Sequence, residues 1–326
     1  MIWLTWRQSR LESLIGGAAL VVVAVFLLLS GQEIVSAYRD SILPDCAARA
    51  AEDQGCRAAA SAFLQEYNTI RGIKMVFLIC LPFLLGLLLA APMVLDFEQG
   101  TYRLAWTQSV TRRRWLATKV AYGLALAAVV SVPLIALWMW GRGPIDDVQG
   151  RFNSNSFDFE GTVPIAYAIF AFALCLAVGT LLRRAIPAVG IGLVGFLLVR
   201  GLVSDQLRHR YFSPVALSWD PLGPIPAAAR NQAFNGDWIL GDGYLDAQGN
   251  QITGGDAVVR GCMTDASAKI GDQVSTCLHD HGIRYALLYH PADRFWTFQA
   301  IETALFLGVA AVLLGITFWW VTRRVV

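Results

Sequence analysis

The residues of this chain best suited to chemistry are histidines and acids in its C-terminal third. The stretch CLHDHG places His279, Asp280 and His281 next to one another, and all three are zinc-ligand types. Consecutive residues rarely reach one tetrahedral ion without ligands from elsewhere. We therefore interpret the stretch as a solvated turn beside Cys277. A membrane enzyme built on this cluster is the alternative, which stoichiometric zinc would support.

Two further patterns bear on catalysis. GDGYLDAQGN resembles a calcium loop only in composition, because the acidic spacing of an EF-hand is absent. The chain also lacks G-x-x-x-x-G-K-[ST], so it cannot hydrolyse nucleotide through a P-loop of its own. We expect no catalytic residue, no metal and no cofactor bound by this chain, and hence no enzyme.

The composition is that of a membrane protein. Of 326 residues, 56% are hydrophobic and 15% are charged, whereas soluble domains carry about a quarter charged. Mean hydropathy is +0.51. A helix crosses the roughly 30 Å of hydrocarbon with about 20 apolar residues. Six charge-free runs are candidate spans: Leu14–Ser30, Met75–Leu95, Val120–Trp140, Val163–Leu182, Ala185–Val199 and Thr303–Val321.

The distribution of Lys and Arg predicts the orientation. The net charge of +2 gives no reason to expect nucleic acid binding. Basic residues gather before the first run, in 103–119, at Arg183 and Arg184, and at Arg323 and Arg324. With six spans these places fall on one side, which the positive-inside rule makes cytoplasmic. Both termini are therefore predicted to be cytoplasmic.

Three segments are left for the opposite side, 31–74, 141–162 and 200–302. The first and third are rich in acids, and each holds two cysteines. Because disulfides persist in oxidising compartments, we predict the bridges Cys46–Cys56 and Cys262–Cys277. Reduced, merely small cysteines are the alternative.

The fold class is an all-α membrane protein with six transmembrane helices. Residues 14–199 hold the first five spans, with 31–74 as an extracellular helical hairpin. Residues 200–302 form an extracellular domain with a small β-hairpin, and 303–326 the sixth span with a basic cytoplasmic tail. Residues 1–13 favour an amphipathic surface helix, with an ordinary flank as the alternative. Its key residues are Trp3, Trp6, Arg7 and Arg10.

The predicted spans contain almost no ionisable residues, which disfavours a proton- or sodium-driven carrier. Arg200 and Glu302 lie near span ends, where we expect them to face water. Ala188 and Gly192 are small residues four apart, a spacing that lets another helix approach closely. Packing within one chain and packing across a dimer both satisfy this pattern.

The loop between the second and third spans resembles a signature of ABC-type-2 exporter permeases. It reads EQGTYRLAWTQSVTRRRWLATK, with an E-x-G-T start and a TxSVTRRxWLxxK end. MIWLTWRQSRLE at the N-terminus looks like the connecting helix of that family. The C-terminal stretch from 290 is similar to the last span and basic tail of a bacterial branch. The intervening outer segments match no pattern.

The resemblance implies the permease of a bacterial plasma-membrane exporter, paired with a second copy or a homologous permease. A separate P-loop ATPase subunit would hold ATP and Mg and receive a coupling helix at 97–118. The substrate class is a drug, peptide or lipid-like amphiphile. The implied coupling residues are Glu98, Gly100, Thr101, Arg103, Leu104, Arg112, Arg113 and Trp115, and the implied substrate path contains Phe77, Phe83, Gly192 and Phe196.

The outer segments are longer than those of the simplest members of that family. They favour an alternative function, an ATPase-linked membrane transducer or sensor whose extracellular domain binds a ligand or regulates a partner. The sequence leaves open the substrate, the identity of the paired permease and the role of this domain.

Overall fold

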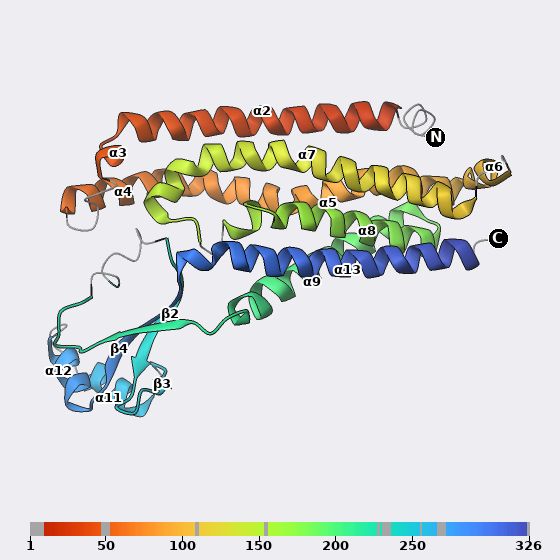
Figure 1. Ribbon diagram of the computed structural model, residues 1–326. Helices are drawn as coiled ribbons and strands as arrows, with labels where there is room; N and C mark the ends of the chain where they lie inside the picture. The colour runs from red at the N-terminus through yellow and green to blue at the C-terminus, as the bar shows by residue number, and fades with distance from the viewer. Residues whose placement is uncertain are drawn as a thin grey trace.

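The computed structural model describes residues 10–46, 53–107, 111–152, 156–226, 229, 236–254, 256–265 and 272–324. Six long helices form an elongated bundle (Figure 1). Each is long and apolar enough to cross a membrane, which confirms the predicted number of spans. They are α2 (Arg10–Asp40), α5 (Asn68–Gln99), α7 (Arg112–Gln149), α8 (Val163–Leu182), α9 (Ala185–Leu202) and α13 (Phe295–Arg323).

Helix α8 lies at the centre of the bundle. It carries no charged residue, is the most buried of the six helices, and packs against α5, α7, α9 and α13. Gly86 of α5 faces the backbone of α8, where a Cβ would lie 2.5 Å from the Phe172 nitrogen. Small residues at helix contacts allow such close packing in membranes. The other helices are thus arranged around α8.

Helix α2 runs along the outside of the bundle and packs chiefly against α7. The two helices touch at Gly31 and Gly141, where a Cβ on Gly31 would lie 2.9 Å from the Cα of Gly141. The opposite side of α2 exposes Val21, Val22 and Leu29. An apolar face of this kind suits lipid contact.

All of the six long helices except α8 are longer than the apolar runs that predicted them, and three extend farthest at one end. Helix α2 continues to Asp40, α7 continues to Gln149, and α13 begins at Phe295 rather than Thr303. Each predicted span stops near a charged residue, whereas the backbone hydrogen bonds of the helix continue past that residue. In the described part of the chain, α3 (Leu43–Cys46) and α4 (Gln54–Glu66) are the helices between α2 and α5. The predicted Cys46–Cys56 disulfide joins these two short helices.

A four-stranded antiparallel sheet follows α9, in the order β1-β4-β2-β3. Its strands are β1 (Val215–Trp219), β2 (Trp238–Leu245), β3 (Gln251–Ile252) and β4 (Arg284–His290). The predicted hairpin corresponds to β2 and β3 alone, in which Tyr244 pairs with Ile252. The sheet is larger because β4 pairs with both β1 and β2. Local turn signals cannot predict such distant pairing.

Two short helices, α11 (Ala257–Asp265) and α12 (Asp272–Asp280), pack beside the sheet. The predicted Cys262–Cys277 disulfide joins them. A small apolar cluster of Val259, Leu278 and Ile283 lies next to the bridge. This core is small, so the disulfide is expected to carry much of its stability.

Replacing both Cys262 and Cys277 with alanine is expected to destabilise this subdomain by about 3 kcal/mol, because a bridge across a loop of this length restricts the unfolded chain. Hydrogen exchange of 257–290 should accelerate while that of α8 stays slow. Cys80→Ala, at a free cysteine, is the control. Unchanged exchange in the double variant would show that the apolar cluster suffices.

The bundle has two distinct ends (Figure 1). The start of α2, the end of α13 and the short helix α6 (Tyr102–Thr107) lie at one, which we name the α6 end. Helices α3 and α4 and the sheet lie at the other, which we name the sheet end.

Candidate functional site

The segment 97–118 is divided among α5, α6 and α7, so the prediction of one coupling helix over these residues is wrong. Helix α5 ends at Gln99, α6 covers Tyr102–Thr107, and α7 begins at Arg112. Gly100 has φ 73° and ψ 9°, the left-handed conformation that ends many helices. Thr111 caps α7 by accepting a hydrogen bond from the Arg114 amide at 3.4 Å. Residues 108–110 lie outside the described part of the chain.

An aromatic cluster fastens α6 to its neighbours. Tyr102 lies 5.2 Å from Phe97 and 4.6 Å from Trp106, measured between ring centroids. Trp115 meets Phe97 edge-on at 5.7 Å. Such pairs contribute about 1 kcal/mol each beyond the area they bury. Trp115 is only 4% exposed, so it packs beneath α6 inside the protein and is not available to a partner.

Polar contacts hold the same turn. Asp96 forms an ion pair with Lys119 of α7 and accepts a hydrogen bond from the Thr101 hydroxyl at 2.8 Å. The Glu98 carboxylate accepts a hydrogen bond from the amide of Ala185, the first residue of α9, at 2.9 Å. A carboxylate at a helix N-terminus is stabilised by the free amides and the helix dipole. The end of α5 is thereby linked to both α7 and α9.

The outward side of this assembly is basic with one large apolar residue. Arg103, Leu104, Arg113 and Arg114 are exposed, and Leu104 is 68% exposed. We name these four residues the α6 tip. Arg112 stacks on Trp106, with its guanidinium carbon 4.6 Å from the ring centroid. The tip therefore combines a rigid base with an accessible surface.

Gly100→Ala isolates the backbone requirement of this turn. A Cβ on Gly100 meets nothing within 4 Å, so only the left-handed φ opposes alanine. That conformation costs a non-glycine residue about 1 to 2 kcal/mol. The thermal midpoint of the purified protein should fall accordingly. Gly308→Ala is the control, because a Cβ on Gly308 in α13 also meets nothing within 4 Å, and it should not lower the thermal midpoint. Equal midpoints for the two variants would show that the turn does not require glycine at residue 100.

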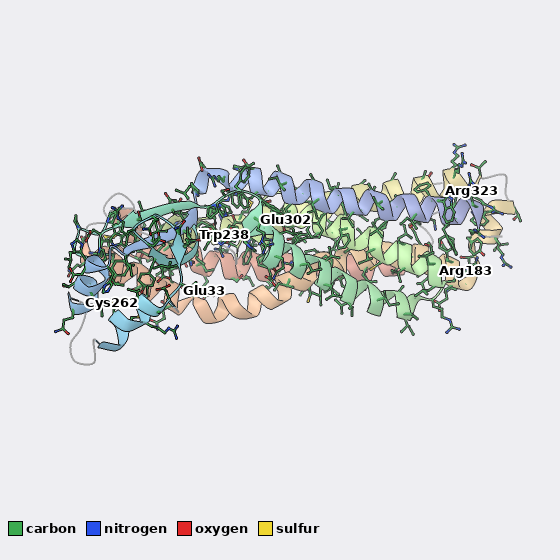
Figure 2. All side chains as sticks on the ribbon, turned by 90° about the horizontal axis from the view of Figure 1, so that it is seen from below. Glu33, Arg183, Trp238, Cys262, Glu302 and Arg323 are labelled. Carbon is green, nitrogen blue, oxygen red and sulfur yellow. A yellow bond between two sulfur atoms is a disulfide. The ribbon has the colours of Figure 1, made fainter. Side chains whose placement is uncertain are left out.

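Other basic residues lie at the same end. Arg183 and Arg184, between α8 and α9, are exposed, and Figure 2 places Arg183 and Arg323 together at one end of the bundle. Arg183 has φ 53°, which is unusual for a residue with a side chain, and its amide bonds to the Gly179 carbonyl at 2.8 Å. The α6 end is thus positively charged on several separate elements.

Near the sheet end, buried ions join four elements, a feature that the sequence analysis missed. Asp158 of η1 (Phe157–Phe159) pairs with Arg200 of α9 at 2.8 Å and with Arg208 of η3 (Arg208–Arg210). Arg208 also pairs with Glu302 of α13 at 2.7 Å, and Tyr167 of α8 donates a hydrogen bond to Glu302. We name these five residues the ion cluster.

The expectation that Arg200 and Glu302 face water is wrong. Arg200 is 5% exposed and Glu302 is fully buried. Burial raises the pKa of Asp158, but Arg208 and Arg200 outweigh burial and leave that pKa below its usual range. The sequence carried no local signal for this pairing, because the partners come from separate elements.

A second buried pairing holds the segment before α8. Glu160 lies 3.0 Å from Arg142 of α7 and 2.8 Å from Arg151. The Gln299 side-chain oxygen of α13 accepts hydrogen bonds from the amides of Thr162 and Val163, both at 3.1 Å. Residues 157–163 are therefore fixed to α7 and α13 before the chain enters α8.

Comparison with known proteins agrees with this architecture. The family described as ABC-2 membrane transporter related matches residues 17–208, from α2 to η3. This chain belongs to that family. No curated protein and no solved structure gave a significant match. The family and the six apolar helices identify a multi-pass component of a membrane transporter. The sheet and α13 lie beyond the matched residues.

In this ABC-2 family member, three of the four residues assigned to a substrate path lie together. The rings of Phe83 and Phe196 are 5.6 Å apart, and a Cβ on Gly192 would lie 3.6 Å from Phe83. Phe83 and Phe196 are 2% and 0% exposed, so within one chain they form core. The side chain of Phe77 is not among those described. Whether these residues meet substrate stays a prediction.

The predicted connecting helix falls mostly outside the described residues, which exclude Trp3, Trp6 and Arg7. Arg10 begins α2, but its side chain is not described. The histidine cluster does not converge on one ion. His279 Nδ1 lies 2.9 Å from Asp220, whereas His281 Nδ1 lies 2.8 Å from the Cys277 carbonyl oxygen.

Proposed function

We propose that this chain is the permease subunit of an ATP-driven exporter and that a separate P-loop ATPase docks on the α6 tip. The observation that carries the proposal is the exposure of Leu104 on a short helix whose other side is fixed by aromatic rings. A groove-binding helix needs one apolar anchor, a polar rim and a rigid base. Arg103 and the basic start of α7 provide the rim.

The contacts of α6 suggest how nucleotide-driven motion would reach the membrane. Tyr102 and Trp106 attach α6 to the end of α5 and the start of α7. The Glu98 bond to the Ala185 amide extends this attachment to α9. Force on α6 would therefore move three spans together as a rigid body. Pro82 and Pro92 lie inside α5 and favour bending there.

A pair of permeases would place the substrate path between its subunits. Helix α9 exposes Ile191, Val194 and Leu198 along one side, which can meet a second copy or a homologous permease. ATP and Mg would be bound by the ATPase and none by this chain. The membrane would be a bacterial plasma membrane. The α6 end would face the cytoplasm, because exposed arginines are concentrated at that end. An amphiphile, drug or peptide is the expected cargo.

Copurification tests the assembly. The chain is isolated from its native membrane in mild detergent, and its partners are identified by mass spectrometry. The expected result is a P-loop ATPase in near-equal amount, retained by the intact chain and lost on deletion of residues 98–104. A monodisperse chain without an ATPase would contradict the proposal.

The buried ion pairs that link the sheet to the spans favour a second candidate function, an ATPase-linked transducer. The sheet is joined to the bundle through η3 and the start of α13, both of which enter the ion cluster. Removing residues 230–290 should abolish all output of a transducer but change only gating or specificity in an exporter. Substrate accumulation in energised inverted vesicles counts directly against the transducer.

A further inference from the structure

A crevice lies between α2 and α7, towards the sheet end, and Tyr67, the residue before α5, borders it. Apolar residues of both helices form most of its wall, and Ser30, Tyr67, Trp138 and Arg142 contribute polar groups. Its volume is about 30 Å³. That space holds a group the size of one or two water molecules. A single hydroxyl or ester oxygen of a larger molecule fits it, whereas a whole sugar or a peptide does not.

Two buried donors beside the crevice have no hydrogen-bond partner among the described residues. They are the indole Nε1 of Trp138 and Nη2 of Arg142, whose side chain is 4% exposed. The Ser30 hydroxyl already donates to the Leu27 carbonyl at 3.3 Å. An unpartnered buried donor is costly and is normally satisfied by protein, water or ligand. The crevice therefore favours an oxygen acceptor.

The surrounding charges determine which acceptor. The Arg142 Nε lies 2.8 Å from Asp146 and 3.0 Å from Glu160, and Glu160 also pairs with Arg151. Among the described residues, two arginines thus face two acids, so their charges balance without an anion. Burying an unbalanced charge is far more costly than burying a neutral oxygen. An ester or hydroxyl oxygen suits the site better than a carboxylate.

A second hollow of about 40 Å³ adjoins the first and shares Leu27 and Trp138 with it. Its remaining wall is apolar and includes Pro82, Leu134 and Phe159. In α7 and α5 this wall lies farther from the sheet end than Arg142 and Tyr67 do. Along α7 the polar hollow thus lies nearer the sheet end than the apolar one, which is the order of headgroup and chain in a lipid of one leaflet.

We infer that the two hollows bind an uncharged lipid-like amphiphile, with its ester or hydroxyl oxygen at Trp138 and Arg142 and its chain against Leu27 and Pro82. The lining of this site on α2, α5 and α7 contains none of the four residues assigned to the substrate path. It does not depend on ATPase coupling, because the chain alone contains every residue of the site.

Photolabelling tests the inference on the full chain in nanodiscs without an ATPase. The probe is a monoacylglycerol with a diazirine on its acyl chain, and labelled peptides are mapped by mass spectrometry. Labels should fall in 27–34 and 134–145. Unlabelled monoacylglycerol should compete strongly, and a fatty acid of equal length should compete weakly.

A matched pair of variants separates binding from general lipid contact. Trp138→Phe keeps the ring and removes the N–H, so apparent affinity should fall about fivefold, the effect of one hydrogen bond. Trp140→Phe makes the same change at a 43% exposed residue of α7 and should leave affinity unchanged. Ser30→Val fills the crevice and should also reduce labelling.

Three results would overturn the inference: labels spread over the exposed faces of α2 and α9 without competition, equal effects of the two tryptophan variants, or competition by the fatty acid as strong as that of the monoacylglycerol. The first would mean that water alone occupies the crevice. Because no ATPase is present, none of these results affects the proposed exporter, which fails only if copurification fails.

Discussion

Glu302→Gln should destabilise the protein by about 3 kcal/mol or more, because removing one partner of a buried ion pair leaves the other charge unbalanced. Glu302 is fully buried and pairs with Arg208, which is 1% exposed. Among the described residues, the substitution leaves Arg208 with Asp158 as its one carboxylate partner, and Asp158 also pairs with Arg200. Two guanidinium groups would then share one acid inside the protein.

The measurement is the temperature at which half of the purified protein loses its monodisperse state in detergent. Glu33→Gln is the matched control, since Glu33 is exposed on α2 (Figure 2 labels both residues). Its midpoint should stay near that of the unaltered chain. A combined Glu302→Gln and Arg208→Met variant should recover part of the loss because it removes the unbalanced charge. Equal midpoints for Glu302→Gln and Glu33→Gln would show that the cluster contributes little.

Composition and periodicity predicted the six spans and both disulfides because each depends on local sequence. Apolar runs identify a span, and an even number of cysteines in one segment permits a bridge. The positions of helix ends were predicted less well. Asp40 and Gln149 lie past charged residues at which the predicted spans stopped, yet each helix continues to them.

The ion cluster could not be predicted, because its members are distant in sequence. Asp158 and Glu302 are 144 residues apart, and only the packing of α8 against α13 brings them to Arg208. The sheet was underestimated for the same reason, since β1 and β4 pair across a long interval. In the segment 97–118, the residue types supported the family resemblance, but they did not predict that the segment is divided among separate helices. Gly100 ends α5 within the segment for which the family resemblance implied one helix.

That division of the segment determines which residue should matter most for coupling. Trp115 is buried beneath α6, and Glu98 and Thr101 are engaged in hydrogen bonds within the chain. Changes at these residues would disturb the fold of the turn as well as any docking. Leu104 is exposed, and its side chain is the large apolar group on the α6 tip. Leu104 therefore offers the cleanest test of the proposed ATPase contact.

Leu104→Arg should weaken ATPase docking by about 2 kcal/mol, or roughly thirtyfold in Kd, if Leu104 is the anchor of the interface. Stimulation of ATP hydrolysis by the permease should fall with it, while the thermal midpoint of the permease alone stays unchanged. Leu104→Met keeps an apolar side chain and should retain docking. Leu222→Arg, at a 54% exposed residue beyond η3, makes the same change at the sheet end and should have no effect. Full stimulation by Leu104→Arg would place the ATPase contact elsewhere, whereas loss in both arginine variants would point to a general effect of added charge.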